Sequence, residues 1–153
     1  MRALVLLFLI LPSIAVAAET CPWLNAATAG GVLGGPVTNV TITRAHAGDD
    51  ATCEFIRHDG SLLLELRIEV ETMPSPAKDF ATYAARCRSA ALPLKAIGNE
   101  ALACNDGGAG QIVGRVRDRA FVVRISTSDR SAKPSALSEK ARKIAEQVAG
   151  ILF

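Results

Sequence analysis

The sequence predicts an α+β domain in which helices pack on an antiparallel sheet, in the element order α-βββ-α-βββ-α, with two disulfides. Three observations predict this class. Several short segments alternate apolar and polar residues, which is the period of a strand with one wet face. Two segments begin with a proline and carry an apolar stripe at helical spacing. Four cysteines follow a leader that is typical of exported proteins.

The N-terminus has the layout of a secretory signal peptide. Arg2 supplies a positive charge, residues 3–11 form an unbroken apolar run, and small residues lead to Ala18. This order of charge, apolar core and small residues is typical of an export leader. The apolar run is about half the ~20 residues that a membrane-spanning helix needs. We therefore expect residues 1–18 to be a cleaved signal peptide.

Residues 19–153 are expected to form a single secreted domain. About 135 residues are enough for one hydrophobic core and too few for two. The full chain carries 17 Lys and Arg against 15 Asp and Glu, and loss of the leader removes Arg2, which leaves a formal net charge of +1. One Trp and one Tyr offer little for base stacking. We expect no nucleic-acid partner and no stable membrane anchor after the leader is cleaved.

Cysteine usage predicts the covalent framework. Cys21, Cys53, Cys87 and Cys104 all follow the leader, and an even number in an exported chain predicts disulfides rather than free thiols. Their separations of 32, 34 and 17 residues lack the close pairs of a zinc site, so we expect no metal and no cofactor. Three connectivities are open. Geometry favours Cys21–Cys53 and Cys87–Cys104, because each pair could join a helix to a nearby strand.

The first half of the domain predicts one helix and three strands. Asn25 can cap a short helix that Gly34 ends, although two internal glycines weaken it. Strands are expected at 37–44, 52–57 and 62–71. The third alternates most clearly. Its apolar side is Leu62, Leu64, Leu66, Ile68 and Val70, and its wet side is Glu65, Arg67, Glu69 and Glu71.

The second half predicts a helix, three strands and a closing helix. Ser75 and Pro76 begin a helix whose stripe is Phe80, Ala84, Cys87 and Ala91, and Pro93 ends it. Strands follow at 100–104, 111–117 and 120–127, the last two as a hairpin, and a final helix begins at Pro134. We expect the core to form where Leu64, Leu66 and Ile68 meet the helix that carries Phe80 and Ala84.

The opening of the domain resembles that of small bacterial cell-envelope domains of unknown function, many of them lipoproteins. The resemblance is carried by Cys21-Pro22-Trp23-Leu24-Asn25 and Val32-Leu33-Gly34-Gly35-Pro36-Val37, and further on by Cys53-Glu54-Phe55 and Ile97-Gly98-Asn99-Glu100-Ala101. In outline these domains are similar to the PsbP-like sandwich. The chain departs from the lipoprotein members at Cys21, because Glu19 two places earlier does not fit a lipidation signal. The resemblance implies an extracytoplasmic binding, sensing or accessory role.

No catalytic constellation is predicted. His46 and His58 flank a strand of about seven residues, which separates them by about 20 Å or more at ~3.3 Å per residue. Ser61, Ser126 and Ser128 have no histidine close in the expected layout, so none has the adjacent base that a nucleophile needs. We therefore expect no enzyme activity.

Two further segments invite a ligand-binding interpretation. The run Gly107-Gly108-Ala109-Gly110 lacks the lysine and the following helix of a phosphate loop, so we expect a hairpin turn. Arg115, Arg117, Arg119 and Arg124 could form a basic stripe on a wet sheet face. Such a stripe would be an anion or acidic-partner surface, or a solvated face balanced by the glutamates of the third strand, and we favour the solvated face.

These observations predict a non-enzymatic binding, sensing or accessory domain in the periplasm or the extracellular medium. Its ligand would be a protein, a peptide or a small envelope molecule. Two alternatives are open. A secreted hydrolase would assemble its site only in the fold, and a secreted inhibitor or structural subunit would expose a large apolar patch.

Overall fold

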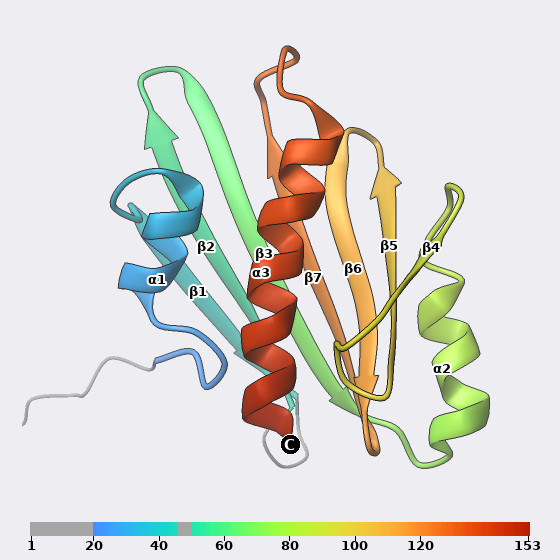
Figure 1. Ribbon diagram of the computed structural model, residues 1–153. Helices are drawn as coiled ribbons and strands as arrows, with labels where there is room; N and C mark the ends of the chain where they lie inside the picture. Colours follow the sequence, from blue (N-terminus) through green and yellow to red (C-terminus); the bar gives the residue numbers. More distant parts are fainter. Residues whose placement is uncertain (1–19, 46–49) are drawn as a thin grey trace, which may run out of the picture.

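A computed structural model describes residues 20–45 and 50–153 (Figure 1). The predicted signal peptide at 1–18 and His46 lie outside the described residues. The elements are α1 (Ala26–Leu33), β1 (Asn39–Arg44), β2 (Ala51–Asp59), β3 (Leu62–Thr72), α2 (Pro76–Ala84), β4 (Leu92–Leu94), β5 (Glu100–Asp106), β6 (Ala109–Val116), β7 (Arg119–Thr127) and α3 (Pro134–Leu152). Within the described ranges, no helix is both long and apolar enough to cross a membrane.

The seven strands form one sheet in the order β1-β2-β3-β7-β6-β5-β4, and every pair of neighbours is antiparallel. The predicted fold class and element order are confirmed. The short edge strand β4, centred on Pro93, is an addition that the sequence pattern did not predict. The pairing of β3 with β7 lies near the middle of the sheet. Its partners Leu64 and Thr127 are 63 residues apart in the sequence.

Helices cover both faces of the sheet. On one face, α1 and α3 pack over the main core, which contains Leu66, Ile68 and Phe121 (Figure 1). On the other face, Phe80 of α2 packs in a smaller cluster with Val113 and Val122. These residues alternate with core residues along β6 and β7, so their side chains point to the opposite side of the sheet.

The prediction that Leu66 and Ile68 pack against the helix of Phe80 and Ala84 is therefore wrong. Both strand residues are fully buried, as expected, but they lie in the main core, which α3 covers. A strand pattern shows which side chains share a face and not which helix covers that face. The longer α3 occupies the more apolar face, and α2 is left with the smaller cluster.

Both favoured disulfides are present. Cys21 pairs with Cys53 and Cys87 with Cys104, with Cα–Cα distances of 5.9 and 5.5 Å. The expected position of Cys87 on the stripe of a helix that runs to Pro93 is wrong, because α2 ends at Ala84. The N–H groups of Arg86 and Cys87 donate to Tyr83 and Ala84, three residues earlier. This tightened final turn directs the chain toward β5.

The predicted helix cap and the predicted glycine-rich turn are both present. The Asn25 Oδ1 accepts a hydrogen bond from the Thr28 N–H at 2.8 Å, which confirms the expected cap of α1. Gly107 and Gly108 have φ of 58° and 85°. Two successive positive φ values are those of a two-residue hairpin turn, so the expected hairpin at this glycine-rich run is confirmed.

Candidate functional site

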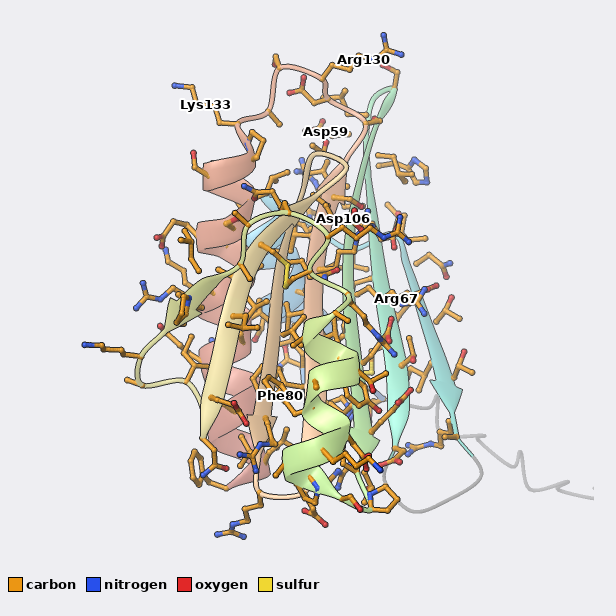
Figure 2. All side chains as sticks on the ribbon, turned by 90° about the vertical axis from the view of Figure 1, so that its right-hand side faces the viewer. Asp59, Arg67, Phe80, Asp106, Arg130 and Lys133 are labelled. Atoms are coloured by element: carbon orange, nitrogen blue, oxygen red, sulfur yellow. A yellow bond between two sulfur atoms is a disulfide. The ribbon has the colours of Figure 1, made fainter. Side chains whose placement is uncertain are left out.

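A cleft of about 440 Å³ lies between α2 and the sheet face that carries it. This α2 cleft falls within the size range of small-molecule sites, roughly 300–1,000 Å³. Its charged and amide-bearing lining residues are Arg67, Glu69, Arg86, Arg88, Asp106, Gln111 and Arg124. Four guanidinium groups against two carboxylates make the lining cationic. Figure 2 shows Arg67 and Asp106 beside the end of α2 that leads to Arg88, with Phe80 farther along the helix.

Strand alternation places two of these arginines on the floor of the cleft. Arg67 lies in β3 between residues that point into the main core, and Arg124 lies in β7 in the same way. The register pairs Arg67 directly with Arg124. Like charges directly opposite each other in an antiparallel pair are destabilising. The floor therefore concentrates positive charge that needs counter-charges.

Carboxylates neutralise only part of this charge. Arg67 forms ion pairs with Glu54 at 3.0 Å and with Glu69 at 2.8 Å. Glu69 also pairs with Arg86 at 2.7 Å, so it bridges the sheet to the wall of the cleft. Among the described residues, Arg124 has no ion pair and its guanidinium no hydrogen bond, although the side chain is half-buried.

Arg88 is the second unpaired cation of the cleft. It is exposed and lies in the segment that follows α2, and no carboxylate of the described chain pairs with it. Asp106, at the end of β5, is likewise without an ion pair in the described part of the chain. The cleft therefore presents two unpaired guanidinium groups and one unpaired carboxylate to solvent.

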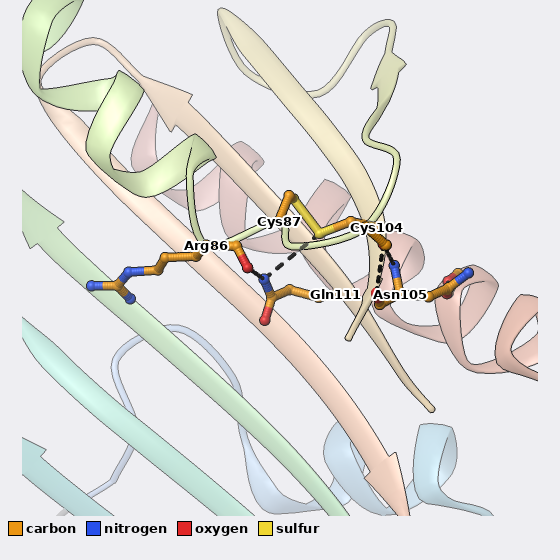
Figure 3. Close-up of a disulfide and its surroundings, with 7 residues drawn as sticks. Arg86, Cys87, Cys104, Asn105 and Gln111 are labelled. Carbon is orange, nitrogen blue, oxygen red and sulfur yellow. Dashed lines mark hydrogen bonds between the residues drawn. A yellow bond between two sulfur atoms is a disulfide. The ribbon is translucent and has the colours of Figure 1, made fainter. Parts of the chain in front are cut away.

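Gln111 connects the floor of the cleft to its wall. It is a buried polar side chain, 5% exposed, and it lies directly across from Arg124. Its Nε2 donates to the Arg86 carbonyl at 3.4 Å and contacts the Cys104 Sγ at 3.7 Å (Figure 3). Its amide oxygen accepts no hydrogen bond from the described residues, so it remains open to a ligand donor.

Two contacts hold α2 in place above the floor. Phe80 is buried in the cluster beneath the helix. The Tyr83 hydroxyl donates a hydrogen bond to Glu71. Burial, followed by this hydrogen bond, raises the pKa of Tyr83 well above its usual range. Tyr83 therefore stays protonated as a donor, and Arg86 lies over its ring at 4.9 Å from the centroid.

The four arginines singled out in the sequence do not share one surface. Arg124 lines the α2 cleft. Arg115 pairs with Glu100 at 2.7 Å, and Arg117 lies exposed in the β6–β7 turn. Arg119 pairs with Asp50 at 3.1 Å and lies over Trp23, a residue of the main core. The β6–β7 turn and the alternation of side chains along the strands place these four arginines on different parts of the surface.

The sequence pattern does not predict Arg67, Arg86 or Arg88 as binding-site residues. The pattern placed Arg67 on the wet face of its strand, and that signal was correct. Its approach to Arg124 depends on the register between β3 and β7. Arg86 and Arg88 were expected on a helix that the structure ends earlier.

Other candidate groups lie apart from the cleft. His58 is exposed near the β2–β3 turn, and the Ser128 hydroxyl accepts a hydrogen bond from the Leu63 N–H. In the part of the chain that the structure describes, no group of three or more His, Cys, Asp or Glu residues is placed to hold a metal ion.

No protein-family model matches this chain, and no curated protein matches it. The chemistry of the α2 cleft is consequently the basis for a functional conclusion. Guanidinium groups form charge-assisted, bidentate hydrogen bonds to carboxylates and phosphates. The arrangement is suited to holding an oxyanion.

Proposed function

We propose that the protein is a non-enzymatic, extracytoplasmic binding domain whose α2 cleft takes a small ligand with a carboxylate or phosphate group. The single observation that carries the proposal is Arg124, a half-buried residue whose guanidinium has no partner among the described residues and which lies directly opposite Arg67. An oxyanion placed between them would offset the like charges of this cross-strand pair and accept charge-assisted hydrogen bonds from both guanidinium groups.

The rest of the lining supports a small ligand rather than an extended polymer. The cleft volume of about 440 Å³ suits a compact molecule. The free amide oxygen of Gln111 and the carboxylate of Asp106 can accept hydrogen bonds from hydroxyl or amino groups of the same ligand. The floor consists of sheet residues, so Arg67 and Arg124 are held on a rigid support.

An extracytoplasmic location is part of the proposal. The leader pattern supports export. The described chain contains two disulfides and no free cysteine, and disulfides persist in oxidising compartments. A domain exported to the periplasm or beyond the cell would meet small organic and inorganic anions there.

The test is a titration of the oxidised protein with inorganic phosphate and, separately, with succinate. Glycerol serves as a neutral probe. We expect saturable NMR shifts of the Arg124 and Gln111 side chains with at least one of the two anions, and none with glycerol.

Variants show whether the binding is local. Arg124→Gln should weaken binding at least ten-fold. Arg130→Gln is the matched control, because it removes the same charge from an exposed loop residue (Figure 2). Equal weakening by both variants would mean non-specific attraction, and the absence of saturable binding to either anion would refute the proposal.

A further inference from the structure

One wall of the α2 cleft is a segment without regular structure. Residues 85–91 connect α2 to β4 and belong to no helix or strand. Arg86 and Arg88, which line the cleft, stand on either side of Cys87. The backbone that carries these two guanidinium groups therefore depends on what attaches Cys87 and its neighbours to the sheet, although the Arg86 guanidinium is also held by Glu69.

Four links attach this segment to the sheet, and one of them is the partly exposed ion pair between Arg86 and Glu69 at 2.7 Å, a type of pair that contributes little stability. The covalent one is the disulfide from Cys87 to Cys104 of β5. The Ser89 hydroxyl donates to the Asn105 carbonyl at 2.5 Å and accepts from the Asn105 N–H at 3.0 Å. The fourth link is the long hydrogen bond from Gln111 to the Arg86 carbonyl. Hydrogen bonds that water can replace contribute little net stability, so the disulfide is the dominant restraint.

The two disulfides differ in accessibility. Cys21 and Cys53 are 9% and 0% exposed and belong to the main core. Cys104 is 4% exposed, but Cys87 is partly exposed at the edge of the smaller cluster. We therefore expect a thiolate to reach Cys87 without entry into the main core. Accessibility is a principal determinant of the rate of thiol–disulfide exchange.

We propose that the Cys87–Cys104 disulfide is a redox-controlled clamp on the α2 cleft. In the oxidised protein it holds Arg86 and Arg88 over the floor, and reduction releases this wall and weakens anion binding. The inference rests on the proposed function of the cleft and assigns a regulation to it. The reductant is an external dithiol, such as a reduced oxidoreductase with two cysteines.

The chemistry balances without any other reactant. One thiolate of the dithiol attacks the Sγ of Cys87, the Cys87–Cys104 bond breaks, and Cys104 leaves as a thiolate that takes up a proton. The second thiol of the reductant loses its proton and attacks the reductant's first sulfur, which is bonded to Cys87 in the mixed disulfide. Cys87 leaves as a thiolate, takes up a proton and becomes a thiol. Two electrons and two protons pass to the protein, and the dithiol becomes a disulfide.

The first experiment measures the order of reduction. The folded, oxidised chain is treated with limiting dithiothreitol, alkylated with iodoacetamide and mapped by mass spectrometry. We expect Cys87 and Cys104 to be labelled at least ten-fold faster than Cys21 and Cys53. Simultaneous labelling of all four cysteines, or earlier labelling of Cys21 and Cys53, would overturn the proposal.

The second experiment compares binding and local motion. In the double variant Cys87→Ser/Cys104→Ser, we expect at least ten-fold weaker binding of the anion that the wild type binds, phosphate or succinate. Hydrogen exchange should accelerate at residues 85–91 and in α2, but not in α3. Ser89→Ala, which keeps the disulfide, should retain binding within about three-fold. Unchanged affinity and exchange in the double variant would refute the clamp.

The two proposals can fail separately. If the oxidised wild type binds neither anion, the proposed function fails, and hydrogen exchange alone then tests whether the disulfide restrains α2 and residues 85–91. Faster exchange confined to α2 and residues 85–91 would then support the clamp, and exchange that is unchanged there would overturn it. If the double variant exchanges rapidly throughout, partial reduction of the wild type provides the same comparison without substitution.

Discussion

Replacement of Arg124 by Gln should make the free protein more stable while it weakens anion binding. Arg124 has no partner to lose in the described chain, and it lies directly opposite Arg67. Two unit charges about 4 Å apart interact by about 1 kcal/mol in water, and the energy falls with distance. The interaction free energies of cross-strand side-chain pairs are roughly 0.2–1 kcal/mol. We expect the free energy of unfolding to rise by an amount in that range.

Urea denaturation at low and high salt measures this gain. The gain should shrink as salt is added, because the partly exposed charges are screened over a Debye length of about 8 Å at physiological ionic strength. Arg67→Gln is the contrasting variant. It removes the same repulsion together with the ion pairs to Glu54 and Glu69, so it should not stabilise the protein as Arg124→Gln does.

The variant with both Arg67→Gln and Arg124→Gln completes a double-mutant cycle. If the repulsion is real, the effects of Arg67→Gln and Arg124→Gln are not additive, because either substitution alone removes it. A destabilising Arg124→Gln, or a gain that is the same at both salt concentrations, would refute the reasoning. The first result would mean that Arg124 has a favourable contact in the free protein, and the second that charge is not the cause.

Three further predictions concern packing and titration. Leu66→Ala should lower the free energy of unfolding by about 2–5 kcal/mol, because Leu66 is 0% exposed in the main core. Glu65→Ala should lower it little. Equal losses of stability in chemical denaturation would contradict the register of β3. Gly110→Ala should destabilise the protein and shift α3, because a Cβ at Gly110 would lie 2.3 Å from the Ser138 N; an unchanged melting temperature would contradict this close approach. Tyr83 is the single tyrosine of the chain, and its pKa is raised above 10.0. Its contribution to stability is therefore complete below pH 10 and is lost as pH rises above that value. Ultraviolet titration should show Tyr83 ionising at a higher pH in the folded protein than in the unfolded one, and coincident curves would contradict the buried contact with Glu71.

Local patterns were sufficient for much of the fold. The alternation around Leu66 identified β3 and both of its faces, and Asn25 identified the start of α1. The glycine pair at 107–108 identified a hairpin turn. These signals are reliable because the spacing of side chains along a strand and the hydrogen-bonding needs of a helix terminus depend on neighbouring residues.

The candidate site was much less accessible to sequence reasoning. The stripe of four arginines was assembled from residues that are close in sequence, but alternation and the β6–β7 turn send Arg119 and Arg124 to opposite faces. The end of α2 was placed too late. Phe80, Ala84 and Cys87 fit a helical stripe, yet the disulfide to Cys104 and the hydrogen bond to the Arg86 carbonyl favour a tight turn. Tertiary contacts of this kind override local propensity.

The sequence by itself determined the element order, the faces of β3 and β7, and a cysteine framework for which one pairing was favoured. It determined these because periodicity and capping are properties of neighbouring residues along the chain. Only the tertiary structure decided that β3 lies beside β7, with Arg67 opposite Arg124, and that α2 covers this face while α3 covers the other. Strand partners and helix placement are set by the burial of the whole apolar surface at once, and residues far apart in the sequence contribute to it together.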